Sequence, residues 1–169
     1  LWVVRKDRAE FHKIALSRSE LEEAVKMLRL GLDPTGLTNL KQVSPFNTTM
    51  AYELYQKLFA PAEQYLDGIR HVMVVPDGAL QSLPLGVLVT EKPKNFVIKK
   101  LKNGVIDFSD YRQVPWLAKK YALSTLPSVS SLKALRVFAK KDHSTQPFTG
   151  FGDPVLDGDE GSQRGVELA

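Results

Sequence analysis

The sequence predicts an α/β fold with a mainly parallel core sheet, flanking helices and an N-terminal β-hairpin. Two short apolar runs, residues 72–75 and 121–126, are typical of core strands, because β-branched and aromatic side chains pack well on a pleated surface. Helical patterns surround and separate these runs, and strands separated by helices usually join in parallel. A third, shorter strand is expected at residues 148–154, where it ends in a Gly-Asp-Pro turn.

Composition limits the class of protein. A chain of 169 residues, 43% hydrophobic and 25% charged, is typical of one globular domain or of part of one. The sequence contains no apolar run of about eighteen residues, which excludes a membrane-spanning helix. The first residues become charged at once, unlike a signal peptide. Because the chain starts at Leu1 and not at Met, we expect it to be a piece of a longer protein.

The absence of cysteine narrows the chemistry. The 169 residues contain no Cys, so disulfides, thiolate metal sites and a cysteine nucleophile are excluded within them. No cofactor is expected. Without a signal peptide or cysteines, the expected location is the cytoplasm.

The N-terminal hairpin is expected from two apolar segments. Residues 1–5 and 9–16 are predicted strands, and residues 6–8 turn between them. Alternation with a period of two predicts that Ala9 and Phe11 point inward, and that Glu10 and His12 point outward. The alternation stops at Lys13, which leaves the end of the second strand undefined.

A first helix follows the hairpin. Ser19 and Glu22 match a capping box, in which the serine caps free N–H groups and the glutamate reaches back. Its predicted apolar face consists of Leu21, Val25 and Leu28. Gly31 is expected to close the helix in the left-handed conformation, with Leu32 folded back on the last turn. Pro34 prevents the helix from continuing.

A second helix is expected at residues 49–59, after a loop at residues 35–45. Either Asn47 or Thr48 caps it, since both residue types satisfy free N–H groups at helix starts. Its predicted apolar face consists of Leu54, Tyr55 and Leu58. Pro61 is suited to the first turn of a short continuation, where its missing N–H costs little.

The strand at residues 72–75 is the centre of the most informative stretch. We expect it to be buried on both faces, as in parallel sheets. Pro76-Asp77-Gly78 then forms a turn, and a leucine-rich segment folds back against the sheet. The returning leucines are Leu80, Leu83, Leu85 and Leu88.

The remaining chain alternates between loops and core elements. Residues 96–98 and 105–108 flank Asn103-Gly104, which predicts a surface hairpin. After the strand at 121–126, Ser128 or Ser130 is expected to cap a helix. That helix carries Leu132, Leu135 and Phe138. Residues 142–147 form a predicted polar loop, and residues 157–169 a flexible tail.

Candidate catalytic residues are few. Three histidines, His12, His71 and His143, lie outside any recognisable motif, and we interpret them as surface or structural residues. Their spacing does not suggest a zinc site. Asp77 and Asp153 lie where strands end and could line a cleft, but we favour aspartates that hydrogen-bond their own turns. Ser128, Ser130 and Ser131 are better explained as helix-start residues than as nucleophiles.

Positive charge gathers in two places. The formal charge is +4, and lysines cluster at Lys92, Lys94, Lys99, Lys100 and Lys102. A second basic group consists of Lys133, Arg136, Lys140 and Lys141. Such patches can attract nucleic acid by releasing counterions. We favour a solvated loop or an edge strand protected by lysines, and regard nucleic acid as an unlikely partner. No phosphate-binding loop or nucleophile elbow is present.

The central stretch resembles the CHAT domain, a caspase-like domain associated with tetratricopeptide repeats. The most specific segment is LYQKLFAPAEQYLDGIRHVMVVPDGALQSLPLGVL, at residues 54–88. The segments LSRSELEEAVKMLRLGL, WLAKKYALSTLPSVSSLKAL and FTGFGDPVL occur around it in the family's order. The resemblance is poorest at residues 91–115.

The resemblance implies a layered caspase-like fold and, in active members, cysteine peptidase activity. The implied dyad is a histidine in a His-Gly motif and a cysteine ending a later strand, both downstream of the Gly-Asp-Pro strand. The thiolate attacks the peptide carbonyl, and the histidine transfers the protons. Neither motif occurs here, so no catalytic residue can be assigned. We therefore expect residues 1–169 to be the N-terminal portion of a single CHAT domain, catalytically inert by itself.

Two hypotheses for the parent protein follow. It is either a caspase-like cysteine endopeptidase, or a non-catalytic protein-interaction or signalling scaffold. The expected partners are proteins, such as tetratricopeptide repeats or the missing C-terminal half of the domain. An incomplete sheet would leave an open edge, which favours a homodimer or aggregation unless something covers it.

Overall fold

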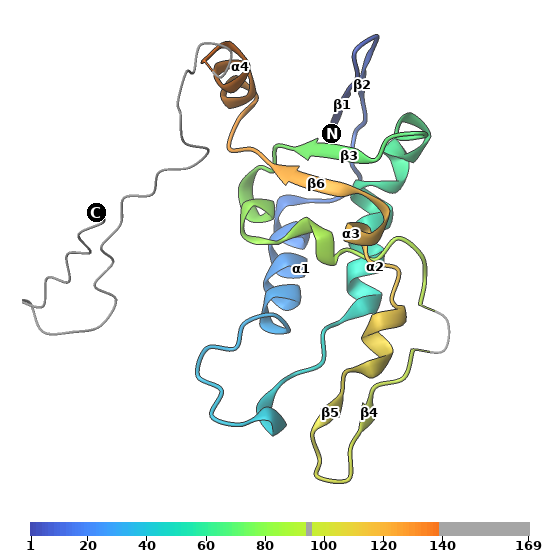
Figure 1. Cartoon of the computed structure of the whole chain (residues 1–169), viewed down its shortest axis with the longest axis vertical. Coiled ribbons are helices and arrows are strands. Elements are labelled where there is room, and N and C mark those ends of the chain that lie inside the picture. The colour runs from blue at the N-terminus through green and yellow to red at the C-terminus, as the bar shows by residue number, and fades with distance from the viewer. Residues whose placement is uncertain (94–95, 139–169) are drawn as a thin grey trace, which may run out of the picture. The chain divides into compact units, whose positions relative to one another are not determined.

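The structure is a computed structural model that describes residues 1–93 and 96–138. It has the predicted α/β fold, with helices and short strands along the chain (Figure 1). The chain divides into two units, Leu1–Ser131 and Leu132–Ala169. The predicted strand at 148–154, the loop at 142–147 and the tail at 157–169 lie outside the described residues, as do Asp153 and His143.

The predicted N-terminal hairpin is confirmed, but with shorter strands. β1 (Trp2–Val4) pairs with β2 (Ala9–Phe11) in antiparallel register, so Trp2 lies opposite Phe11. The predicted inward orientation of Ala9 and Phe11 is wrong. Phe11 is 60% exposed and Ala9 is also exposed, so this apolar face of the hairpin points to solvent.

Long-range contacts explain why the hairpin has its polar face inward. The Arg5 side chain donates a hydrogen bond from Nη1 to the carbonyl oxygen of Tyr65, 2.9 Å away. The ring of His12 packs on the ring of Tyr65, with 5.2 Å between centroids. Glu10 and His12 are therefore half-buried, against the predicted alternation. The local pattern cannot reveal such a contact, because Tyr65 is distant in sequence.

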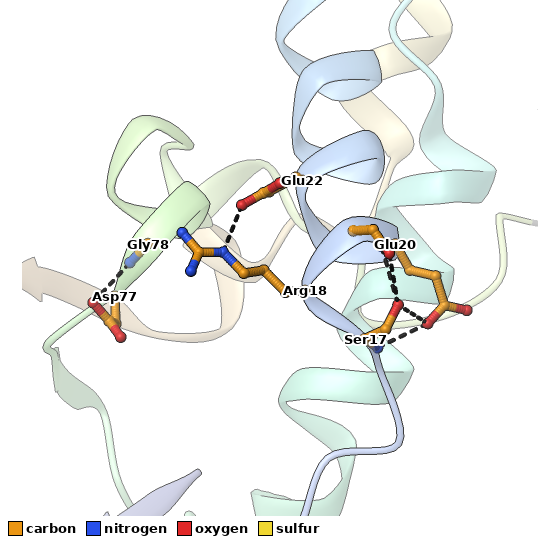
Figure 2. Close-up of polar contacts among 7 residues, drawn as sticks. Ser17, Arg18, Glu20, Glu22, Asp77 and Gly78 are labelled. Atoms are coloured by element: carbon orange, nitrogen blue, oxygen red, sulfur yellow. Dashed lines mark hydrogen bonds and ion pairs between the residues drawn. The ribbon is translucent and has the colours of Figure 1, made fainter.

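α1 (Arg18–Leu30) begins two residues earlier than predicted. Its cap is Ser17, not Ser19: the Ser17 Oγ accepts from the N–H of Glu20 at 3.2 Å, while the Glu20 carboxylate accepts from the N–H of Ser17 at 2.7 Å (Figure 2). Both serines have a glutamate three residues later. Only the earlier cap places Leu16 and Leu21 as the flanking hydrophobic pair, and both pack against the core.

The two serines offer a matched test of this cap. We expect Ser17→Ala to reduce the free energy of unfolding by about 1 kcal/mol, because an N–H group at the start of α1 loses its acceptor. We expect Ser19→Ala to change stability by less than about 0.5 kcal/mol, since Ser19 is an exposed residue of the first turn. Urea denaturation of both variants measures the difference, and equal losses would contradict the assignment.

Gly31 ends α1 in a different way from that predicted. Its φ of −80° and ψ of −4° are right-handed helical values, so the predicted left-handed closure is wrong. Leu32 is 40% exposed and does not fold back into the core. A Cβ at Gly31 would lie 3.0 Å from the Cα of Phe46. Glycine is suited to this position because the chain at Phe46 passes close to it.

The second predicted helix is confirmed as α2 (Thr48–Leu58). Asn47 is its cap, since its side-chain oxygen accepts from the N–H of Met50 at 3.0 Å. A 3-10 helix, η2 (Ala60–Tyr65), continues it with Pro61 in its first turn, as predicted. The loop before α2 contains one further 3-10 turn, η1 (Leu40–Gln42).

The core sheet of the described residues consists of β3 (His71–Val74) and β6 (Ala122–Thr125), paired in parallel. One face, with Val72, Val74 and Leu123, packs against the main hydrophobic cluster. The opposite face is open: Met73 is 44% exposed and the following Val75 is 41% exposed. The prediction that β3 is buried on both faces is therefore wrong for the described part of the chain.

The leucine-rich segment after β3 forms the centre of the core, as predicted. It folds into two 3-10 helices, η3 (Gly78–Ser82) and η4 (Leu85–Val87). Its buried side chains include Leu83, Leu85, Leu88 and Val89. The carbonyl oxygen of Leu88 accepts from the N–H of Leu117, at 2.7 Å, at the start of α3 (Leu117–Lys120). This bond joins the segment to the helix that precedes β6.

The predicted hairpin around Asn103-Gly104 is confirmed with a shifted first strand. β4 (Lys99–Lys100) pairs antiparallel with β5 (Ile106–Asp107), and a 3-10 helix, η5 (Ser109–Gln113), follows. Farther along, α4 (Val129–Phe138) starts at the predicted cap Ser128, whose Oγ accepts from the N–H of Ser131 at 3.1 Å. In the described ranges, no helix is both long and apolar enough to cross a bilayer.

Candidate functional site

The carboxyl ends of β3 and β6 lie side by side, the position at which open α/β sheets bind ligands. The N–H of Leu126 donates to the carbonyl oxygen of Val74 at 2.8 Å, which holds the two ends together. The chain then turns at Asp77, whose carboxylate accepts from the N–H of Gly78 at 2.8 Å. The interpretation of Asp77 as a turn residue is thus confirmed. Gly78 has a φ of +56°, a conformation that favours glycine.

Arg18 extends from the first turn of α1 toward this turn (Figure 2). Its Nε lies 2.8 Å from the Oε1 of Glu22, one helical turn away. The hydrogen bond and the charge of Glu22 raise the pKa of Arg18, against a small desolvation effect, and the charge of Asp77 adds a weaker contribution. Arg18 is therefore paired with Glu22, and the charge of Asp77 influences it only weakly. Because its side chain is 89% exposed, this ion pair adds little stability.

A groove of about 370 Å³ lies between α1 and η3, next to this cluster. Apolar and charged side chains line it: Glu22, Val25, Lys26, Arg29, Leu30, Asp33, Ala79 and Ser82. Ser82 donates its hydroxyl hydrogen to the carbonyl oxygen of Ala79, at 2.8 Å, and does not contact a base. The groove is thus suited to contact with a binding partner, and it contains no activated nucleophile among its lining residues.

His71 and Ser124 form a polar pair on the open face of the sheet. The Nε2 of His71 lies 2.8 Å from the Oγ of Ser124. A histidine–serine contact is the first requirement for nucleophilic catalysis. Within the described residues, however, no side chain orients the second ring nitrogen of His71, which is exposed beside a half-buried Ser124. A cross-strand hydrogen bond explains the pair equally well.

The other sequence candidates do not join a common site. The Nε2 of His12 is buried beneath the hairpin and has no hydrogen-bond partner among the described residues, and His12 is far in sequence from His71. Ser128 contacts Ser130 and Ser131 through their hydroxyl oxygens, at 2.9 and 2.8 Å, as expected for a cluster at a helix start. In the part of the chain that the structure describes, no group of three His, Cys, Asp or Glu side chains could hold a metal ion.

The structure also reveals a partly buried polar cluster that the sequence patterns did not predict. Tyr55 is fully buried and donates its hydroxyl hydrogen to Glu63. Lys120 lies 2.5 Å from the same carboxylate oxygen. Burial, followed by the hydrogen bond to Glu63 and its charge, raises the pKa of Tyr55. The cluster connects α2, η2 and α3, which pack around the core. Its only signal in the sequence was the polar pair Glu63-Gln64 shortly after Pro61.

The lysine-rich hairpin borders a second hollow of about 400 Å³, lined in part by Phe96, Lys99 and Asp110. Lys99 lies 2.9 Å from Asp110, which neutralises part of the local positive charge. That contact raises the pKa of Lys99, through the hydrogen bond first and then the charge. Lys99 and Lys100 form the edge strand β4. This agrees with the interpretation, favoured from the sequence over a nucleic-acid surface, that lysines protect an edge strand.

One protein-family model matches most of the chain. The family model described as CHAT domain matches residues 48–166, well over half of the chain. The matched range starts at α2 and includes the parallel pair β3–β6 and the leucine-rich segment. The hairpin β1–β2 and α1 precede it. No curated protein and no solved structure matches the chain.

Proposed function

Since this chain belongs to the CHAT domain family, we propose that it is the N-terminal, non-catalytic portion of a caspase-like domain. The observation that carries this proposal is the complete lack of cysteine in the 169 residues. The peptidase chemistry implied by the family needs a thiolate and a histidine that moves its proton. The chain has three histidines, but none is followed by glycine as in a His-Gly motif.

The chain would contribute the framework on which a catalytic dyad is placed. The paired ends of β3 and β6, with the turn at Asp77, form one wall of the crevice that such sheets present at their carboxyl ends. In this proposal the residues present position a cleft, and the reacting groups come from a later part of the domain.

The proposal is tested by a cleavage assay on the purified chain. We expect no release of product from fluorogenic peptides or from denatured casein, because neither a thiolate nor an oriented Ser–His pair is available. A variant Ser124→Ala is the matched control, since it removes the one Ser–His contact found in the described residues. Turnover that is present in the chain and absent from Ser124→Ala would contradict the proposal.

An interaction module is a second candidate, favoured by the open face of β3–β6. Met73 and Val75 are about two fifths exposed there, although core strands of this type are normally covered on both sides. The cover would be a protein: tetratricopeptide repeats, the remainder of the domain or a second copy. Sequencing the parent gene beyond the codon for residue 169 would distinguish the peptidase from the interaction module. A His-Gly strand and a later Ala-Cys strand would favour the peptidase, and their absence the interaction module.

A further inference from the structure

The N-terminal hairpin presents an apolar face with no covering element among the described residues. This face, here called the Trp2 face, consists of Trp2, Val4, Ala9 and Phe11. Trp2 is 67% exposed, Val4 is 73% exposed and Phe11 is 60% exposed. The rings of Trp2 and Phe11 pack across the strands with 5.0 Å between centroids. Contiguous exposed apolar surface of this kind marks interaction sites.

The outward orientation of the Trp2 face is fixed by the rest of the chain. Leu1 and His12 exchange backbone hydrogen bonds of 2.9 and 2.8 Å, which set the strand register. Arg5 ties the inner side to the Tyr65 carbonyl oxygen. A slip by one residue would turn the aromatic rings inward, but it would break these bonds. The aromatic pair is therefore held in one orientation before any partner arrives, which lowers the entropy cost of binding.

The charges around the Trp2 face are mainly positive. Lys6 and Arg8 lie in the hairpin turn and Lys13 follows β2, and all three are exposed. The acidic residue of the turn, Asp7, lies 3.4 Å from the Nε of Arg8, so these two charges offset each other and Lys6 and Lys13 supply the net positive charge. A partner with negative charge at its rim would therefore be attracted, and a basic partner repelled.

We propose that the Trp2 face binds an amphipathic helix of another protein, one whose apolar stripe is flanked by Asp and Glu. The face is two residue pairs long and two strands wide, roughly 7 Å by 5 Å. A face this narrow is no wider than one helix, which is about 10 Å in diameter, so it can contact the apolar stripe of a single helix. The inference holds whether the parent protein is a peptidase or an interaction module, since the hairpin lies before the matched range.

A second copy of the chain suits this face less well. The exposed parts of the two aromatic side chains amount to roughly 200–300 Å² per copy. A dimer through this face would then bury well below the roughly 1,000 Å² that stable interfaces need, and one docked helix would bury a similar area, so we expect weak binding and area does not separate the two occupants. A dimer would also bring two basic rims together. The charge argument therefore favours an acidic partner over a second copy.

The experiment measures binding of a synthetic helix to the full 169-residue chain by fluorescence anisotropy. The probe is a labelled peptide with leucines at i, i+3, i+4 and i+7 and glutamates at the flanking positions. We expect saturable binding that weakens at high salt. We expect Trp2→Ser and Phe11→Ser each to weaken it about tenfold, since exposed aromatics are typical hot spots. Leu40→Ser, at an exposed apolar site away from both the Trp2 face and the β3–β6 face, is the matched control and should leave the affinity within about twofold.

Three outcomes would overturn the proposal. The first is equal binding of a matched peptide in which lysine replaces every glutamate. The second is equal loss of binding in Leu40→Ser and Trp2→Ser, which would show a nonspecific apolar contact. The third is binding of the chain to anionic vesicles, or self-association, that Trp2→Ser abolishes while the glutamate peptide fails to bind. None of these outcomes affects the cleavage assay, so the failures of this inference and of the proposed function are distinguishable.

Discussion

Replacing Leu88 by alanine is expected to lower the free energy of unfolding by about 2–5 kcal/mol. Leu88 is fully buried and belongs to the leucine-rich segment at the centre of the core. Truncation removes apolar contacts and leaves a cavity, because the surrounding helices relax only partly. A globular domain has about 5–15 kcal/mol of stability in total, so the variant would lose a large share of it.

Urea denaturation followed by tryptophan fluorescence measures this loss, because Trp116 packs against the same core. The matched control is Leu30→Ala in α1, where Leu30 is 59% exposed. Its expected change is within about 0.5 kcal/mol. If both alanine variants lost the same stability, the core would not be organised around the leucine-rich segment.

Replacing Glu63 by alanine is expected to cost about 1–3 kcal/mol, because the buried hydroxyl of Tyr55 loses its acceptor. The ion pair with Lys120 adds less, since both side chains are more than one third exposed and solvent screens them. Most of the loss should therefore depend on the tyrosine hydroxyl and not on the lysine charge.

A double-mutant cycle separates the two contributions. In a Tyr55→Phe background the hydroxyl is absent, so Glu63→Ala should cost less than about 1 kcal/mol. In a Lys120→Met background the cost should stay near its original value. The interpretation is refuted if Tyr55→Phe leaves the effect of Glu63→Ala unchanged.

The same cluster predicts a pH dependence. Burial raises the pKa of Glu63, but the hydrogen bonds from Lys120 and Tyr55, with the charge of Lys120, lower it by more. The folded state therefore binds this proton less readily than the unfolded chain, whose glutamate pKa is about 4.3. The stabilisation is present above that pH and is lost as the pH falls below it. The difference in urea midpoint between the native chain and Glu63→Ala should accordingly narrow below about pH 4.

Features with a local cause were predictable from sequence. The turn at Asp77, the cap at Asn47 and the hairpin at Asn103-Gly104 depend on residues a few positions apart. The CHAT resemblance was also recognisable, because its most specific segment forms the core. The leucines of that segment pack in the core, and their side chains have no reactive group.

Features decided by distant contacts were mispredicted or missed. The alternation at Phe11 gave the wrong face, because Tyr65 holds the polar side of the hairpin inward. The two possible serine caps of α1 were distinguished only by the packing of Leu16 and Leu21. Glu63 joins Tyr55, in another helix, to Lys120, which is 57 residues away, and no periodicity reveals such a contact.

The parallel pairing of β3 with β6 has a consequence for synthesis of the chain. His71 lies opposite Ala122, so the two strands are separated by 122 − 71 = 51 residues. A ribosome adds about 5–20 residues per second, so β3 emerges roughly 3–10 s before its partner. During that interval its backbone N–H and C=O groups and its apolar side chains can pair with other nascent strands. The antiparallel hairpin β1–β2 closes over a few residues and has no such delay, so the vulnerable period of the nascent chain begins at β3 and ends when β6 is synthesised.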